Sequence, residues 1–543
     1  MKSAFPLILL CCASLFAVEP EFRLTYSIFF PATHIHTKLA REWADAIHER
    51  TQGRVQIDIY PGCVLSGAGE NYECVTKGVS DLGMSCFSYS RGMFPMIEGL
   101  DLPLGYRDGK QATRIANAYF RKFRPKELDE TEVMLIHSHG PGILATRPQV
   151  QRVSDIKGLS IRGTGISAMV IRALGGNAIG MGQPDTYEAL RKGVVDATLC
   201  PIETLKGWKQ GEVIESVVRI PSAGYTTAMF VVMNRDTWRS LPKDIQQIFR
   251  ETNEEWIPKH GQAWDDADEA GEAFVRSLGK SVSTLAPEED AIAAKAIQPV
   301  LDAWATSVDK RGLPGHEALA FLQEQIKVQD NPPLAPLPPS PDTDAARSRP
   351  WHLGWLLTVY ALLAVAGVFT VQGGRLQEAF WAIYQTVAAR LAFALALVSG
   401  LSLLAIIALT LADIVGRKLG CPLRGAIDIA QLLAGVSTAT ALPYVTALKG
   451  HIAVEFFFQR LSPRRRVFWD TISRLAVITF FLYLAITAFQ QGARLLAKHA
   501  VGLSIAIPIF WIQWVMAISF CLTILVVTFN LMHPGKAMIQ PKA

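Results

Sequence analysis

The spacing of apolar and polar residues divides the chain into two halves. Up to about residue 330, apolar and polar positions alternate as they do in a water-soluble protein. Beyond Trp351 the chain contains several apolar runs close to the roughly 20 residues that a helix needs to cross a bilayer. The pattern therefore predicts a soluble α/β half and an all-α transmembrane half in one polypeptide of 543 residues.

The soluble half starts with a strand, a helix and a second strand. Residues 22–30 alternate like a strand, and Leu39, Trp43 and Ile47 mark one face of a helix. Residues 55–60 alternate again and are followed by proline and glycine. This order of elements is typical of an α/β fold.

Two similar segments lie far apart within the soluble half. Residues 72–81 and 187–196 share Tyr, Glu, Lys, Gly, Val and Asp in the same register. Each segment is typical of a helix that ends at a glycine and leads into a strand. Such units also recur by chance in α/β proteins, but the shared side chains favour two similar α/β lobes with a cleft between them.

Three further segments are placed to connect the two lobes. The predicted strand 133–136 leads through Gly140-Pro-Gly142 to residues 143–147, and residues 226–233 form a candidate return strand. A helical pattern that starts after Pro242 has the length to span both lobes. A chain that crosses a hinge more than once allows two lobes to close as rigid bodies.

Arg162 is the strongest candidate for a functional residue. It ends a short predicted strand, residues 155–162, which leads directly into the glycine-containing segment 163–168 and a helix. A guanidinium group can hold a carboxylate through two parallel hydrogen bonds, and the free N–H groups at a helix start favour an anion. We therefore expect an anion-binding site at this corner.

The segment Gly163-x-Gly165-x-x-Ala168 also fits part of a dinucleotide-binding fingerprint. That fingerprint requires an acidic residue at the end of the next strand, and here the corresponding region, residues 180–185, is a turn. The sequence contains no nucleophile elbow, HExxH motif or paired-cysteine metal pattern. We therefore expect no enzyme activity, no cofactor and no metal site.

Charge and export signals define the compartment. The formal net charge of +5 comes without a dense basic stripe, so we expect no nucleic-acid partner. Lys2 followed by the apolar residues 5–17 predicts a secretory signal peptide over residues 1–17. Cleavage before Cys11 or Cys12, as in a lipoprotein, is the alternative. The soluble half is expected to be exported.

Four cysteines fall in the exported half: Cys63, Cys74, Cys86 and Cys200. Their spacing matches no Cys/His metal pattern. An oxidising compartment would allow a disulfide between Cys63 and Cys74, but four buried thiols are the favoured interpretation.

The soluble half resembles a known family in several motifs: Phe29-Phe-Pro-Ala-Thr-His34, Thr51-Gln-Gly-Arg-Val55, Tyr60-Pro-Gly62, Asp155–Arg162 and Met233–Pro242. These motifs resemble the periplasmic solute-binding subunit of tripartite ATP-independent periplasmic (TRAP) transporters, over residues 22–330. The resemblance implies a two-lobed periplasmic solute-binding fold. It also implies that Arg162 pairs with the carboxylate of the substrate.

Other site residues carry over from the resemblance less directly. Sialate-binding members have a second ligand arginine, whose position here is Gly142, and Arg147 is the nearest alternative. Cys200 stands where many members have an amide, which implies a smaller or less polar substrate than a sugar acid. Five further residues are candidates to line the cleft, although each could equally have a structural role: Phe30, His34, Tyr89, Glu203 and Trp208.

The second half begins with a proline-rich linker, residues 331–350, which predicts an extended spacer. Five membrane spans follow, near residues 352–371, 391–412, 427–447, 467–490 and 505–531. Residues 388–532 resemble the small, four-span membrane subunit of TRAP transporters through motifs around Asp413, Asp428 and Lys449. The additional span, residues 351–371, is needed because the receptor lies outside and the small subunit begins in the cytoplasm.

The charge of the loops predicts the topology. Lys449, Arg460 and residues 464–466 lie between the third and fourth predicted spans, which places that loop in the cytoplasm. The soluble domain then lies in the periplasm, and the C-terminus lies in the cytoplasm. We expect a protein of the bacterial inner membrane, with five transmembrane helices in the lipid bilayer after signal cleavage.

The combined interpretation is a tethered receptor for transport. The soluble domain is expected to bind a small organic acid, and a separate large TRAP membrane subunit is expected to couple uptake to a sodium gradient. The acid could be a monocarboxylate, a C4-dicarboxylate, a 2-oxo acid, an aromatic acid or a sulfonate. The alternative is a membrane-anchored periplasmic sensor of solutes.

Overall fold

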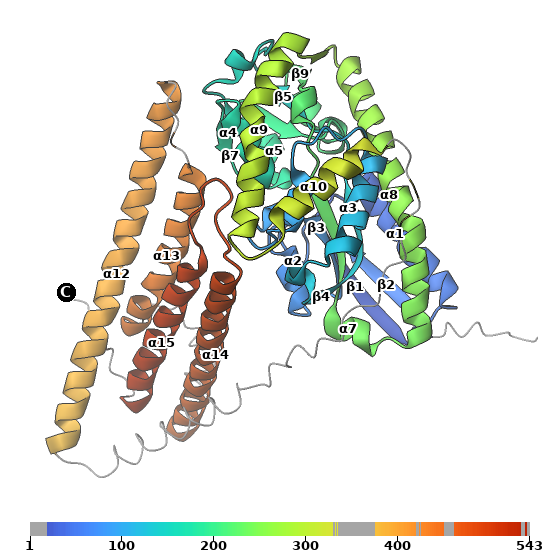
Figure 1. Ribbon diagram of the computed structural model, residues 1–543. Coiled ribbons are helices and arrows are strands. Elements are labelled where there is room, and N and C mark those ends of the chain that lie inside the picture. Colours follow the sequence, from blue (N-terminus) through green and yellow to red (C-terminus); the bar gives the residue numbers. More distant parts are fainter. Residues whose placement is uncertain are drawn as a thin grey trace, which may run out of the picture.

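The computed structural model describes residues 19–328, 332, 334, 375–419, 423, 425–449, 461–533 and 538–539. Figure 1 shows an α/β body beside a bundle of long helices, which confirms the predicted fold class. The predicted signal peptide, the additional span 351–371 and nearly all of the linker 331–350 lie outside the described residues.

The first lobe is built on a five-stranded sheet with the order β2-β1-β3-β10-β4. The first three strands of this order run parallel, and β10 is antiparallel to both of its neighbours. The strands are β1 (Phe22–Ile28), β2 (Val55–Tyr60), β3 (Leu82–Cys86), β4 (Thr131–Ser138) and β10 (Ala228–Asn234).

The second lobe is built on a six-stranded sheet with the order β11-β9-β5-β8-β6-β7. Here β6 runs parallel to β7 and β8, and β5 is antiparallel to β8 and β9. The strands are β5 (Ile143–Thr146), β6 (Ser160–Arg162), β7 (Asn177–Ile179), β8 (Ala197–Cys200), β9 (Ser216–Arg219) and β11 (Ser281–Thr284).

The two similar sequence segments occupy equivalent places in the two sheets. Helices α2 (Asn71–Thr76) and α5 (Gln183–Arg191) are followed by Gly78 and Gly193, with φ of 69° and 70°, a left-handed conformation that glycine adopts without steric cost. The strands that follow, β3 and β8, each lie between a parallel neighbour and an antiparallel crossing strand. The prediction of two similar lobes is confirmed.

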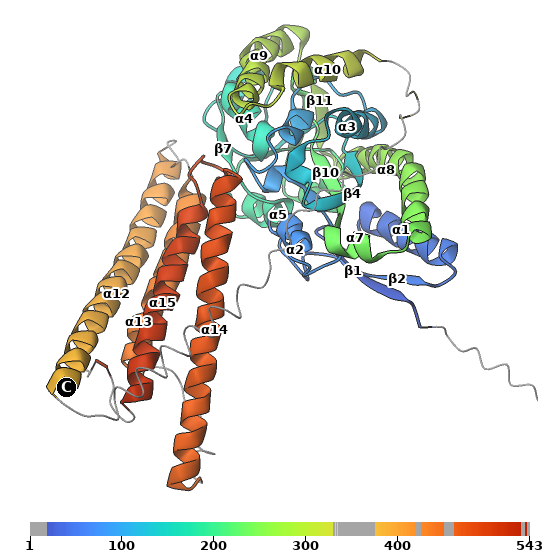
Figure 2. The same ribbon diagram turned by 60° about the horizontal axis from the view of Figure 1, so that its bottom comes forward.

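Three connections join the lobes, as the sequence pattern predicts. The chain passes from β4 to β5, returns from β9 to β10, and then forms the long helix α8 (Lys243–Ser277). Helix α8 packs against α1 (Ile35–Arg50) and α3 (Gly109–Phe123) of the first lobe and α6 (Thr204–Gly207) of the second. Figures 1 and 2 show α8 running along both lobes.

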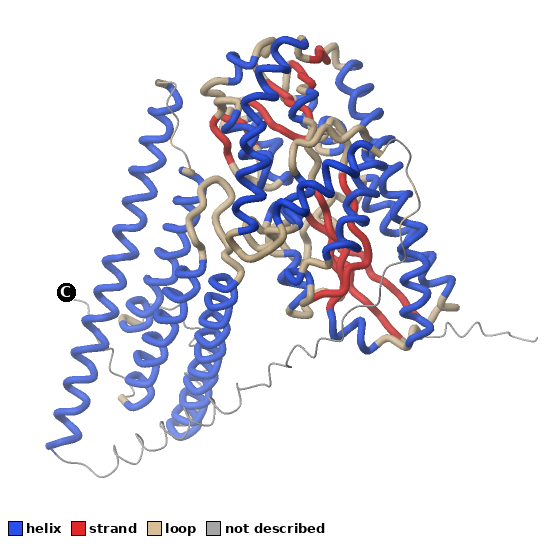
Figure 3. Tube along the Cα trace, viewed as in Figure 1, coloured by secondary structure: helices blue, strands red, loops and turns tan. Residues whose placement is uncertain are grey.

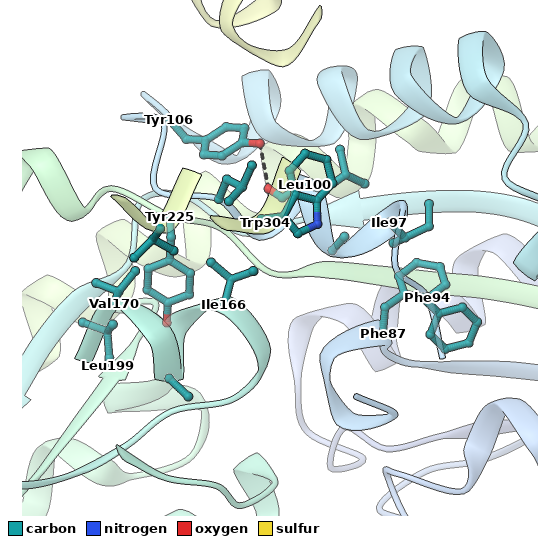
Figure 4. Close-up of a cluster of buried hydrophobic side chains, with 14 of the residues drawn as sticks. Phe87, Phe94, Ile97, Leu100, Tyr106, Ile166, Val170, Leu199, Tyr225 and Trp304 are labelled. Carbon is teal, nitrogen blue, oxygen red and sulfur yellow. Dashed lines mark hydrogen bonds between the residues drawn. The ribbon is translucent and has the colours of Figure 1, made fainter. Parts of the chain in front are cut away.

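A continuous apolar core extends from one lobe into the other. Phe87, Phe94 and Ile97 of the first lobe belong to the same buried cluster as Ile166 and Leu199 of the second, as Figure 4 shows. The helices α9 (Pro287–Asp309) and α10 (Gly315–Lys327) cover this cluster. Burial of apolar surface is therefore shared between the lobes as well as within each lobe.

The described residues of the second half form four long helices, and Figure 3 shows them as a separate helical bundle beside the mixed body. They are α12 (Arg375–Lys418), α13 (Ala426–Ala447), α14 (Pro463–Ala497) and α15 (Phe510–Met532). All four contain stretches long and apolar enough to cross a membrane. Large apolar side chains such as Leu401 and Phe480 are exposed on their surface, as contact with lipid requires.

The β4–β5 and β9–β10 connections between the lobes are in contact at Gly142. Its N–H donates to the carbonyl of Tyr225 at 2.9 Å, and a Cβ atom at residue 142 would lie 2.0 Å from Cε1 of the Tyr225 ring. A side chain of any size is excluded here unless the ring moves. This contact explains in physical terms why an arginine does not fit at the position of the second family arginine.

We predict that Gly142→Ala destabilises the soluble domain by about 1–3 kcal/mol, because the added methyl group overlaps the buried Tyr225 ring. Urea unfolding of residues 19–328 measures the change. Gly182→Ala is the matched control, since Gly182 has a φ of −64° and a Cβ there would meet its nearest atom at 3.4 Å. Wild-type stability of Gly142→Ala would contradict the close contact of the crossings.

Candidate functional site

A small buried pocket lies between the two lobes, with a cavity volume of about 30 Å³. An organic acid of even a few carbon atoms needs more room, so binding requires the lobes or the side chains of the wall to move. The wall is formed by Phe29, Phe30, Cys86, Tyr89, His139, Arg162, Thr164, Gln183, Pro201, Glu203, Thr204, Trp208, Tyr225, Thr227, Met229 and Trp264.

Arg162 is the last residue of β6, and its side chain is 5% exposed. The backbone is fixed by the parallel register with Ile179 of β7, and the side-chain Nε donates to the carbonyl of Met181 at 3.0 Å. Among the described residues, no side chain forms a hydrogen bond or ion pair with its terminal amino groups. The guanidinium is therefore held in place through one nitrogen and keeps its bidentate edge for another partner.

Aromatic rings from both lobes form the apolar part of the wall. Phe29 of the first lobe stacks on Trp208 of the second with 6.0 Å between ring centroids, and Phe30 lies 6.2 Å from the same ring. The Tyr89 hydroxyl accepts a hydrogen bond from the backbone N–H of Gln183 across the cleft at 3.1 Å. These contacts hold the lobes together around the pocket.

His34 and Glu203 form a further bond between the lobes. His34 Nε2 lies 2.7 Å from Glu203 Oε1, and the two side chains are 1% and 3% exposed. His34 Nδ1 accepts from the backbone N–H of His36, so Nε2 carries a proton and donates to the carboxylate. The second carboxylate oxygen of Glu203 has no hydrogen-bond partner among the described residues.

Five of the eight residues predicted from the sequence line the pocket: Phe30, Tyr89, Arg162, Glu203 and Trp208. The structure places the other three elsewhere. His34 lies behind Glu203 and borders an outer groove, and Cys200 is fully buried behind the wall, where the Thr204 hydroxyl lies 3.2 Å from its sulfur. Arg147 is exposed to solvent beside Gly193, outside the pocket.

The sequence interpretation did not include several residues of the wall. Gln183 lies within the predicted turn 180–185, and His139 and Tyr225 flank the two crossings between the lobes. A polar or aromatic residue beside a predicted crossing is a signal that could have identified the last two. Trp264 comes from the middle of α8, where its helical spacing indicates only a buried face.

The described cysteines of the soluble half are unpaired. Cys63 and Cys74 are partly buried, while Cys86 and Cys200 are buried. Burial raises the pKa of the Cys86 thiol to about 12 and that of the Cys200 thiol to about 11, although the nearby charge of Arg162 acts in the opposite direction. Both thiols therefore remain protonated near neutral pH, which is typical of structural cysteines.

A cluster of buried histidines lies where α1, β4 and α8 meet beside the hinge. His36 Nδ1 and His260 Nδ1 are 3.1 Å apart, and the Trp264 Nε1–H donates to His137 Nδ1 at 3.0 Å. The rings of His36, His137 and His260 offer nitrogen atoms within 4.8 Å of one another. Nε2 of His36 and Nε2 of His137 have no hydrogen-bond partner among the described residues.

Burial keeps this cluster neutral. It lowers the pKa of His260 to about 3, and it lowers the pKa of His36 and His137 well below the usual range. Burial also lowers the pKa of His139, which is not part of the cluster, to about 4. The neighbouring histidines lower the pKa of His36 and His137 further, because two positive charges would repel each other.

Two similar lobes, three crossings and a pocket at the hinge define a binding protein that closes around a small solute. The family model for bacterial extracellular solute-binding proteins, family 7, matches residues 26–307, and the model for the DctQ component of tripartite ATP-independent periplasmic transporters matches residues 406–533. The chain belongs to the TRAP transporter family, with a periplasmic solute-binding domain fused to a small membrane subunit. It is an inner-membrane transport component and not an enzyme.

Related proteins support this assignment. The chain is 22% identical over 343 residues to the outer membrane transporter protein TsaT of Comamonas testosteroni, which covers 58% of this chain and 97% of the relative. It is 23% identical over 277 residues to the C4-dicarboxylate-binding periplasmic protein DctP of Rhodobacter capsulatus, which covers 50% of this chain and 83% of the relative.

Solved structures of TRAP solute-binding proteins have the same fold. One from Rhodoferax ferrireducens, in complex with benzoate, is 25% identical, covers 56% of this chain and 97% of its own, and has a TM-score of 0.54. One from Bordetella bronchiseptica, with bound mandelate, is 27% identical, covers 57% and 99%, and has a TM-score of 0.53. Because the soluble half covers nearly the whole of these chains, it should fold on its own.

We predict that His260→Gln makes the stability of the soluble domain less dependent on pH. In the unfolded state His260 becomes protonated as the pH falls below about 6.5, whereas in the folded state it stays neutral down to about pH 3. Wild type therefore loses up to about 1.4 kcal/mol per pH unit in this window through His260, and the variant does not.

Urea unfolding at pH 7, 6 and 5 measures both proteins. Burial raises the pKa of Glu127 to about 8, so this residue changes the stability with pH in the direction opposite to His260. Glu127 favours folding at low pH, and this contribution is lost as the pH rises toward 8. Because Glu127 is present in both proteins, the difference between their pH slopes isolates the effect of His260. Equal pH slopes for the two proteins would contradict a neutral, buried His260.

Proposed function

We propose that the soluble domain binds an organic acid between its lobes through Arg162 and delivers it to a TRAP uptake transporter. The C-terminal helices are the small membrane subunit of that transporter, and a separate large subunit uses an ion gradient, expected to be sodium, to drive uptake. The observation that carries the proposal is the buried guanidinium of Arg162, which keeps its bidentate edge in a pocket between two closing lobes.

The energetics of burial support a carboxylate ligand. A buried cation without a partner costs several kcal/mol, and a carboxylate that bonds it in bidentate geometry offsets that cost. Glu203 lines the same pocket, but one of its oxygens is already bonded to His34. The aromatic rings around Arg162 suit an acid with an apolar body. Benzoate and mandelate, which relatives bind, have this combination.

Contacts between the two halves support delivery within one chain. The loop from residue 498 to residue 509 connects α14 and α15, and Figure 1 shows it beside the soluble body. Its Val501 N–H donates to the carbonyl of Arg91 in the first lobe at 3.2 Å, and its Ser504 hydroxyl accepts from the N–H of Gly180 in the second lobe at 2.7 Å. The loop therefore touches both lobes beside the cleft.

The same loop is fixed to the membrane half by Asp428. One oxygen of this carboxylate accepts hydrogen bonds from the backbone N–H groups of Ser504 at 2.8 Å and Ile505 at 3.1 Å. Two more contacts join the halves: Lys498 with Glu130, and Gln491 with Glu73. An opening of the lobes would therefore move the surfaces on which the membrane loop rests.

This docking supports the proposed orientation. The end of α14 at Ala497 lies beside the soluble domain, so the residues 464–466 at its start lie roughly 50 Å away along the 35-residue helix. That distance exceeds the hydrocarbon thickness of a bilayer, roughly 30 Å, and the arginine-rich start then lies in the cytoplasm. The match of residues 406–533 to a transporter subunit favours transport over the alternative role as a sensor.

We predict that Arg162→Ala weakens the binding of the acid by about 30-fold or more, because the carboxylate loses a buried partner. Thermal shift and calorimetry of residues 19–328 with a panel of small acids measure the loss. Arg147→Ala, at an exposed arginine outside the pocket, is the matched control and should bind as wild type does. An unchanged response of Arg162→Ala would refute the assignment.

A second prediction concerns docking. Lys498→Glu places a carboxylate against Glu130 and should slow uptake by about two- to fivefold, because like charges repel across a partly exposed contact. The double variant Glu130→Lys with Lys498→Glu should restore uptake. The measurement is acid uptake by vesicles that contain the full chain and the large subunit. Wild-type uptake by the single variant would count against this docking contact.

A further inference from the structure

The pocket contains hydrogen-bonding groups that a simple carboxylate does not use. Glu203 is 3% exposed, and its Oε2 has no partner among the described residues. His139 is 1% exposed, and its Nε2 likewise has none. A buried polar atom without a partner costs roughly 1–3 kcal/mol, so both atoms call for a partner that the ligand would bring.

Glu203 Oε2 and His139 Nε2 are both hydrogen-bond acceptors. An ionised carboxylate only accepts hydrogen bonds. His139 Nδ1 lies 2.5 Å from the carbonyl of Gly140, which can only accept, so Nδ1 carries the ring proton and Nε2 keeps its lone pair. The residues that line the pocket therefore include one cationic donor, Arg162, and two side chains with a buried acceptor, His139 and Glu203, of which Glu203 also borders the outer groove beside His34.

A third group of the pocket restricts which kind of ligand group can bond to these acceptors. The side-chain amide Nε2 of Gln183 also lines the pocket without a partner, and this atom is a donor. A hydroxyl group donates one hydrogen bond and accepts others, so it can satisfy an acceptor and a donor together. An ammonium group has three N–H donors, cannot accept from Gln183, and would be repelled by Arg162.

We propose that the ligand is a hydroxy-substituted carboxylic acid, with its carboxylate on Arg162 and its hydroxyl donating to Glu203 Oε2. This inference rests on the proposed function, because it assumes that an acid occupies the pocket. The bond between Glu203 Oε1 and His34 orients the carboxylate, so His34 acts as a positioning residue. Recognition of the hydroxyl thus requires the two lobes to be closed, since His34 and Glu203 come from opposite lobes.

Matched pairs of acids test the inference on wild-type residues 19–328 by calorimetry. The pairs are phenylacetate and mandelate, benzoate and 3-hydroxybenzoate, and propionate and lactate. In the pair that fits the pocket, we expect the hydroxy acid to bind about tenfold tighter or more, because its counterpart leaves Glu203 Oε2 unpaired. Phenylglycine tests an ammonium group in place of the hydroxyl of mandelate.

Two variants separate recognition from lobe closure. Glu203→Leu should bind both members of the pair with nearly equal affinity, whereas His34→Leu keeps the acceptor without its orienting bond and should prefer the hydroxy acid by a smaller factor than wild type. If Glu203 served only to hold the lobes together, both variants would weaken both acids and keep the same preference, which would overturn the inference. The comparison of acids on wild type decides the question even if a variant does not fold.

The outcomes separate this inference from the proposed function. Equal affinity within every pair, with binding that still depends on Arg162, would overturn the hydroxyl assignment alone. Tighter binding of phenylglycine than of mandelate would also overturn it. If no acid of the panel bound the wild-type domain, the proposed function and this inference would both fail.

Discussion

The candidate site of the soluble half is organised around the buried positive charge of Arg162. Arg162 lies at the end of a strand, almost fully buried, and among the described residues only its Nε has a hydrogen-bond partner. Burial of an unpaired guanidinium is costly because the charge is desolvated, and a negative group beside it would offset that cost. The two lobes bring aromatic side chains to the pocket that this charge lines. In the proposed function, ligand binding and lobe closure therefore both serve to balance this charge.

The contacts across the cleft indicate how closure of the lobes could affect the contacts with the membrane half. The Phe29–Trp208 stack, the Tyr89–Gln183 bond and the His34–Glu203 bond all join opposite lobes around the pocket. The loop between α14 and α15 also touches both lobes, through Val501 and Ser504. An opening of the lobes would separate the two surfaces on which this loop rests. Fusion into one chain keeps these surfaces at a high local concentration.

Much of this arrangement could be predicted from the sequence, because local patterns reflect local physics. The periodicity of apolar residues predicts the strands and long helices, and the repeated segments predict that β3 and β8 hold equivalent places. Arg162 could be identified because it stands between a strand and a helix start. The four membrane helices followed from length and hydropathy.

Contacts between distant segments could not be predicted in the same way. The bond between His34 and Glu203 joins residues from different lobes, and no local pattern marks either of them as a partner. Arg147 is close in sequence to the first crossing between the lobes. It directly follows β5, and there it is exposed to solvent. Cys200 stands at the position where many family members have an amide. It nevertheless lies behind the pocket wall, because the end of β8 is fully buried. Side-chain placement at the hinge depends on how the crossings pack.

The most direct test of this account is a crystal structure of residues 19–328 with a bound acid. The account predicts that a carboxylate group lies against Arg162, with two oxygen-to-nitrogen distances of about 2.7–2.9 Å, in a pocket enclosed by both lobes. A carboxylate seated on another cation, with Arg162 bonded only to protein groups or water, would contradict it.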